Sequence, residues 1–93
     1  MLITHAVRQH VLHVTLLRDL DVTNRAAAAL QVQALVQTHR PTRVVIAVPT
    51  VDPTPATLSA LARAHRMCLS LGIPLALSGA SARTRRLLDA TAE

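Results

Sequence analysis

Short apolar runs alternate with longer segments of helical periodicity along this chain. Residues 44–48 are rich in β-branched side chains and end at Pro49, which predicts a strand that is central in a sheet and covered on both faces. Residues 2–7 and 11–17 predict two further strands, joined by a polar turn and most simply antiparallel. A fourth strand is predicted over 73–77.

Helical patterns occupy the segments between these strands. The alanine-rich stretch 26–38 predicts a first helix, and Asp21 or Thr23 is positioned to cap it. A second helix is predicted over 55–71, because Thr54 can cap it and a proline at its first position needs no hydrogen-bond partner.

The end of the chain completes the pattern. Gly72 supplies a helix stop, and the small-residue turn 78–81 leads into a last helix that reaches Thr91. The predicted order is therefore β-β-α-β-α-β-α. Strands separated by helices pair in parallel through right-handed crossovers, whereas the opening pair is antiparallel. The predicted fold class is α/β, a mixed β-sheet packed with helices in a single domain over residues 1–93.

The core must be built from aliphatic side chains, because the sequence contains no Phe, Tyr or Trp. Cys68 lies at helical spacing from apolar residues and is expected to be a packed thiol. His65 is expected on the same side of the helix, where it would act as a hydrogen-bonded packing residue. The strands and the inward face of the second helix predict six largely buried residues: Val45, Ile46, Leu58, Leu61, Leu75 and Leu77.

The formal charge is +5, and every basic residue is Arg. The absence of Lys is more typical of a GC-rich coding sequence than of selection for guanidinium chemistry. Arg83, Arg85 and Arg86 predict a solvated helix face rather than a nucleic-acid site, since the chain has no aromatic ring to stack on a base. No apolar run is long enough to span a bilayer and no signal-peptide pattern is present, so a cytoplasmic location without a membrane partner is expected.

Enzymatic constellations are missing from the sequence. The five His residues are scattered, the serines lack an elbow motif, and two glycines cannot form a glycine-rich phosphate loop. The single cysteine excludes an internal disulfide and a CxxC motif. We therefore expect no catalysis, no metal site and no cofactor.

Four sequence blocks carry a family resemblance over nearly the whole chain: DLDVTN after the second strand, RVVIAV as the central strand, LSALARAHRMCLSLGIPLALSG as helix plus strand, and ASARTRRLLDAT as the closing helix. In order and spacing they resemble a STAS domain, the module of bacterial anti-sigma factor antagonists and of sulfate transporter tails. Members commonly continue into another strand and helix, so the resemblance implies a C-terminally minimal version.

The resemblance implies a particular switch in the loop before the second helix. There the family carries Asp-Ser-Ser/Thr-Gly, whose second hydroxyl is phosphorylated by a kinase that is also the anti-sigma factor. Alignment on Leu58 and Gly72 places Thr54 at the Asp, residues 55–56 at the two hydroxyl positions and Thr57 at the Gly. The usual acceptor is missing, and a slip of one residue would make Thr57 the substitute. Its alternative roles are helix capping or exposure to solvent.

The resemblance also implies a partner, an anti-sigma factor with a histidine-kinase-like ATPase domain, and hence regulation of a bacterial sigma factor. For Asp21, capping of the first helix is the alternative to a direct contact. The predicted partner-binding residues are Asp21, Thr23, Asn24, Asp52, Thr54, Thr57, Ser78 and Gly79.

Two other classes of function stay open at this point. A STAS-like unit could form a homodimer or serve as a scaffold subunit of a regulatory assembly. A small ligand or nucleotide could bind where the parallel strands end, near the first turns of the helices that follow.

Overall fold

A hairpin opens the chain in the computed structural model, which describes residues 2–90. Strands β1 (Ile3–Arg8) and β2 (Val11–Leu16) pair antiparallel. The two residues between them, Gln9 and His10, both have positive φ, at 52° and 66°. A two-residue type I′ turn requires this conformation, and its twist matches that of the strands. The predicted opening pair is confirmed.

Helices and strands alternate after the hairpin. The remaining elements are α1 (Arg25–His39), β3 (Arg43–Ala47), α2 (Pro55–Ser70), β4 (Leu75–Ser78) and α3 (Ala82–Ala90). The sheet order is β1-β2-β3-β4, with β2, β3 and β4 parallel to one another. The predicted order and the mixed sheet are confirmed. The predicted helix end at Thr91 lies outside the described residues.

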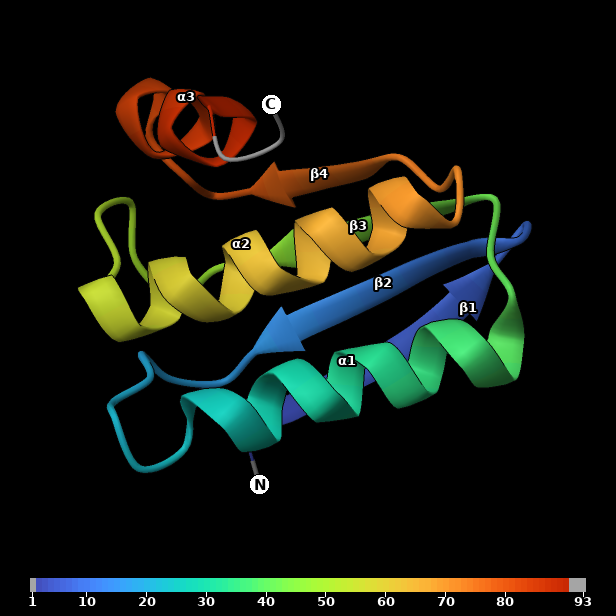
Figure 1. The fold of residues 1–93 in the computed structure, drawn as a ribbon, viewed down its shortest axis with the longest axis horizontal. Helices are drawn as coiled ribbons and strands as arrows, with labels where there is room; N and C mark the ends of the chain where they lie inside the picture. The colour runs from blue at the N-terminus through green and yellow to red at the C-terminus, as the bar shows by residue number, and fades with distance from the viewer. Residues whose placement is uncertain (1, 91–93) are drawn as a thin grey trace.

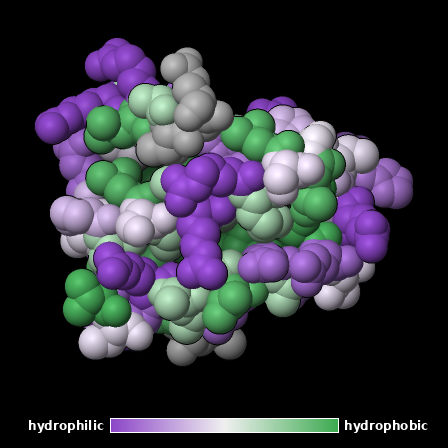
Figure 2. Space-filling view, viewed as in Figure 1, coloured by the Kyte–Doolittle hydropathy of each residue, from purple (hydrophilic) through white to green (hydrophobic). Residues whose placement is uncertain are grey.

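The elements form two layers. Helices α1 and α2 lie side by side on one face of the sheet, and α3 lies beyond β4 (Figure 1). The face of the molecule on the helix side carries a mixture of hydrophilic and apolar residues (Figure 2). Within residues 2–90, no helix combines the length and the apolar character that crossing a membrane would require.

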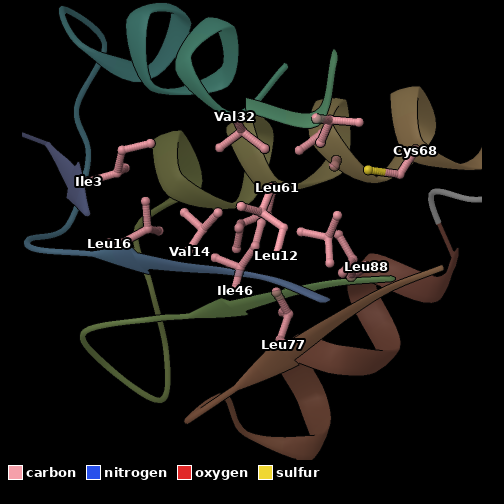
Figure 3. Packing of buried hydrophobic residues seen from close by; sticks show 14 residues of the cluster. Ile3, Leu12, Val14, Leu16, Val32, Ile46, Leu61, Cys68, Leu77 and Leu88 are labelled. Atoms are coloured by element: carbon pink, nitrogen blue, oxygen red, sulfur yellow. The ribbon is translucent and has the colours of Figure 1, made fainter. Parts of the chain in front are cut away.

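The core fills the space between the sheet and this helix layer (Figure 3). Side chains alternate between the two faces of a strand, and the register aligns like with like across the sheet. Leu12 pairs with Val44, and Val14 pairs with Ile46. All four side chains are fully buried beneath the helices. Leu61 of α2 belongs to the same buried cluster.

The prediction that the central strand is covered on both faces is wrong. Val45 and Ala47 of β3 point away from Val44 and Ile46, and they are only half-buried. Among the described residues all three helices lie elsewhere, so β3 is covered on one face and not on both (Figure 1). A run of β-branched residues is therefore compatible here with a sheet that has one uncovered face.

The six predicted core residues divide accordingly. Ile46, Leu61 and Leu77 are buried, as predicted. Val45, Leu58 and Leu75 are half-buried, so the prediction is wrong for them. Val45 lies on the uncovered face, Leu58 on the flank of α2 that lines a groove toward α3, and Leu75 at the start of an edge strand.

The two residues of α2 that were expected to pack inward, Cys68 and His65, both lie in the core. The Cys68 thiol is fully buried, and burial raises its pKa to about 11, as expected of a packed thiol. His65 is also buried, which confirms its packing role. Its Nδ1 has no hydrogen-bond partner among the described residues, so the predicted hydrogen bond is wrong for that atom.

The second helix ends as predicted, but the following strand starts later. Gly72 has a φ of 73°, the left-handed conformation that ends helices. The Ile73 N–H still donates to the Cys68 carbonyl at 2.9 Å, and Pro74 has no N–H. Strand β4 therefore begins at Leu75 and not at Ile73.

Replacing Leu61 by Ala should lower the free energy of unfolding by about 2 to 5 kcal/mol, because it removes buried methyl groups and leaves a cavity. Leu69→Ala is a matched control on the same helix, since Leu69 is 43% exposed whereas Leu61 is 3% exposed. Chemical denaturation followed by circular dichroism measures both. Equal losses in the two variants would show that Leu61 is not a core residue.

Candidate functional site

Three loops meet at one end of the sheet. Parallel strands end at the same edge, so the loops after β2, β3 and β4 lie together at the left of Figure 1. Seven of the eight predicted contact residues lie in these loops or in the first turn of α2, and the eighth, Ser78, is the last residue of β4: Asp21, Thr23, Asn24, Asp52, Thr54, Thr57, Ser78 and Gly79. The structure thus places at one end residues that are far apart in the sequence.

A hydrogen-bonded cluster joins the β2–α1 loop to the start of α2. The Thr54 N–H donates to both carboxylate oxygens of Asp19 at 3.2 Å. The Thr54 hydroxyl donates to the Leu20 carbonyl at 2.8 Å and accepts from the Thr57 N–H at 3.2 Å, which makes it the predicted N-cap. The Thr57 hydroxyl donates to Asp19 Oδ1 and accepts from the Leu20 N–H at 2.8 Å.

Thr57 is the buried centre of this cluster. Its side chain is fully buried, so the alternative that it faces solvent is wrong. Its hydroxyl acts as donor and acceptor at once, in contact with Asp19 and Leu20. Thr54 caps the helix, and Thr57 ties that helix to the preceding loop. A kinase could reach the Thr57 hydroxyl only after these contacts open.

Asp19 was not among the residues singled out from the sequence. Partial burial acts to raise the pKa of its carboxyl, but the hydrogen bonds donated by Thr57 and Thr54 outweigh this effect, and the pKa lies below its ordinary value. The start of α2 also favours a negative charge. The available signal was a carboxylate in the loop after β2, which shares its end of the sheet with the capping Thr54.

Asp21 organises a separate turn before α1. Its Oδ1 accepts from the N–H groups of Thr23 at 2.8 Å and Asn24 at 3.1 Å, and from the Thr23 hydroxyl. The Asn24 side chain in turn accepts from the Asp21 N–H at 2.8 Å. The bonds from Thr23 and Asn24 hold the pKa of Asp21 below its ordinary value. The N-cap residue of α1 is Asn24, and no side chain makes a capping hydrogen bond there, so the prediction that Asp21 or Thr23 caps this helix is wrong. Asp21 instead holds the turn before the helix.

The loop between β3 and α2 is braced a second time, by the start of α3. The Ser81 hydroxyl lies 3.2 Å from Asp52 Oδ1, and the Ser81 N–H donates to the Val51 carbonyl at 3.1 Å. The Thr84 hydroxyl donates to that same carbonyl at 3.1 Å. The loop is thus held on one side by Asp19 and on the other by α3.

A close approach of two backbones explains the glycine in the last loop. Gly79 has a φ of 79°, and a Cβ at this position would lie 3.3 Å from the Val48 carbonyl oxygen. The preceding residue, Ser78, accepts from the Val48 N–H at 3.0 Å and is otherwise exposed. Both predicted residues thus help to join β4 to the end of β3.

Two apolar side chains project from these braced loops. Val22 is 75% exposed in the Asp21 turn, and Val51 is 57% exposed at the tip of the β3–α2 loop. No other large apolar side chain among residues 2–90 is as exposed. The same part of the chain contains no group of three or more His, Cys, Asp or Glu residues arranged to hold a metal ion. This arrangement is suited to binding another molecule through preformed loops.

No model of a known protein family matches the chain, and no curated protein matches it.

Replacing Thr57 by Val should lower the free energy of unfolding by about 1 to 3 kcal/mol, because it leaves the buried Leu20 N–H without an acceptor. Thr57→Ser keeps the hydroxyl and is the matched control. Urea denaturation at neutral pH measures both variants. A Thr57→Val protein as stable as wild type would contradict a structural role for this hydroxyl.

Asp19→Asn should weaken the acid dependence of stability. The folded pKa of Asp19 lies below the ordinary value of 3.8, so its charged form stabilises the fold above that value. This contribution is lost as the pH falls through the folded pKa. The stability gap between wild type and Asp19→Asn should therefore shrink between about pH 6 and about pH 3. Denaturation at both pH values measures it, and an unchanged gap would rule out this linkage.

Proposed function

We propose that this chain is a non-catalytic, STAS-like protein-binding module that contacts an anti-sigma factor with a histidine-kinase-like ATPase domain. The order of strands and helices agrees with the fold that the resemblance implies. The four sequence blocks that carry the resemblance supply two of the four strands, β3 and β4, together with most of α2, all of α3 and parts of the loops at the carboxyl ends of the parallel strands. Binding, in this proposal, takes place at those loops.

The observation that carries this proposal is the exposure of Val22 and Val51 on neighbouring, braced loops. Exposed apolar side chains with a polar surround are typical of protein contact sites. Here the polar surround comes from Asp21 and Asp52, one beside each valine. Because hydrogen bonds already hold both loops, less conformational entropy is lost when a partner binds.

The proposed contact is constitutive and not switched by phosphate. Residues 55–56 lack the hydroxyls expected at the acceptor positions, and the buried Thr57 hydroxyl already donates one hydrogen bond and accepts another. A phosphate there would add a charge of about −1.5 to −2 next to the Asp19 carboxylate, which like-charge repulsion opposes. Regulation would then depend on the amount of the module or of its partner.

The test is titration of the purified chain with a candidate anti-sigma kinase by calorimetry. Val22→Asp and Asp52→Arg should each weaken the complex by about tenfold or more. The first places a negative charge in the contact, and the second reverses the charge there. Leu30→Asp is the matched control, because Leu30 is 54% exposed on α1 outside these loops. Equal weakening by Leu30→Asp would move the contact away from the loops.

A second measurement on the same purified proteins decides whether the partner phosphorylates the chain. After incubation with kinase and ATP, intact-mass measurement should find the chain unmodified while the complex persists. Stoichiometric phosphate mapped to Thr57 would instead establish the switch.

A scaffold role is the second candidate, supported by the uncovered sheet face that carries Val45 and Ala47. A stable homodimer without affinity for any candidate kinase would favour that role.

A further inference from the structure

The outer edge of β1 presents backbone groups that β2 does not use. The Leu17 N–H donates to the Leu2 carbonyl at 3.0 Å, which fixes the phase of the antiparallel ladder. Because hydrogen-bonded and non-hydrogen-bonded pairs alternate in such a ladder, the N–H and C=O groups of Ile3, His5 and Val7 point away from β2. Strand β1 is the last strand on this side of the sheet.

This edge has little of the usual protection against pairing, since its one charged residue is Arg8 at the end of the strand. Natural edge strands are blunted by proline, lysine, bulges or inward-pointing charges. Residues 3–8 of β1 contain no proline, glycine or lysine, and their pairing with β2 is continuous. The other edge strand, β4, is shorter and leads into α3, which lies beside it (Figure 1). The β1 edge is therefore the one that can accept another strand.

An apolar groove of about 370 Å³ lies directly beside the same edge. Its walls come from Ile3 and His5 of β1 and from Ala34 and Leu35 of α1. Ile3 and His5 thus supply both the unused backbone groups and one wall of the groove. A strand added to β1 would point every second side chain into this groove, because side chains alternate along a strand.

Charge indicates what kind of strand fits. His5 lines the groove, with its ring 5.6 Å from that of His39, and the exposed Arg8 ends β1 on the opposite face of the strand. None of the residues that line the groove is acidic. A second copy paired antiparallel over residues 3–8 would place Arg8 opposite Ile3 and offer it no carboxylate, because β1 contains no acidic residue. An acidic strand would be attracted instead.

We propose that the β1 edge and its groove bind an extended acidic peptide segment of a partner by strand addition. The segment has apolar side chains at alternate positions, which enter the groove, and carboxylates between them, which lie on the side of Arg8 and Thr4. This surface is distinct from the loops at the carboxyl ends of β2, β3 and β4. Its occupation does not depend on the function proposed for those loops.

The probe is a fluorescein-labelled peptide in which valine and glutamate alternate over ten positions, titrated with the full chain by fluorescence anisotropy. It should bind saturably, and its affinity should fall with added salt. Two control peptides keep the length. One has the same composition in two blocks, and the other has lysine in place of glutamate. Both should bind at least about tenfold more weakly. The first loses the alternation of apolar and acidic residues, and the second carries positive charges in place of negative ones.

Matched variants locate the site. Ala34→Glu places a carboxylate in the groove, whereas Ala27→Glu makes the same change on an exposed position of α1 outside it. Ala34→Glu should weaken binding by at least about tenfold, and Ala27→Glu should leave it within about twofold. Val7→Pro should also weaken binding, because it removes an outward N–H without touching the ladder with β2. Val7→Ala keeps that N–H and is its control.

Three results would overturn the proposal. The first is no saturable binding of the alternating peptide. The second is equal weakening by Ala34→Glu and Ala27→Glu. The third is a chain that is dimeric by light scattering and becomes monomeric in Ala34→Glu, which would assign the edge to a second copy. Circular dichroism shows whether Val7→Pro remains folded. Where it does not, the alanine pair decides.

Discussion

The structure depends on a single-sided core. One face of the sheet is apolar from β2 to β4, and it must be covered, but the chain has no aromatic side chain to fill a thick interior. Small residues solve this problem. Alanines on α1 and α2, among them Ala28, Ala29 and Ala60, are buried in a second cluster and allow the two helices to lie close together. The close approach brings both helices over the aliphatic side chains of the sheet (Figure 3).

The position of α2 over the sheet determines the arrangement of the loops. Its first turn meets the β2–α1 loop, where the Thr57 hydroxyl and the Asp19 carboxylate satisfy each other and the Leu20 N–H. A buried polar group without a partner is costly, so this cluster fixes one arrangement of the two segments. The result is a rigid base from which Val22 and Val51 project.

A two-layer fold with an open edge leaves several surfaces for partners. The braced loops offer exposed apolar tips beside carboxylates, whereas the β1 edge offers backbone groups beside an apolar groove, with Arg8 at the end of the strand. These surfaces differ in charge and in the kind of contact they make. They lie on different parts of the fold, since the loops follow β2, β3 and β4 whereas the groove lies between β1 and α1. The two proposals therefore assign different surfaces of one small domain, the loops to a folded partner and the β1 edge to an extended one.

Much of the fold was determined by the sequence itself. Apolar periodicity, the Thr54-Pro55 helix start and the Gly72 stop depend on local physics, and each predicted element is present in the described residues. The candidate loops could be placed together because parallel strands end at one edge. Local patterns also explain why Cys68 and Leu61 are buried.

Only the tertiary structure decided which groups meet. Val45 and Ile46 are equally apolar in sequence, but only one face of β3 is covered, so Val45 is half-buried. Asp19 acquires its role from Thr57, which is 38 residues away in the chain. The buried His65 Nδ1 has no hydrogen-bond partner among residues 2–90, which the helical spacing of this residue did not reveal. Long-range packing brings such groups together, and no local pattern of residues encodes it.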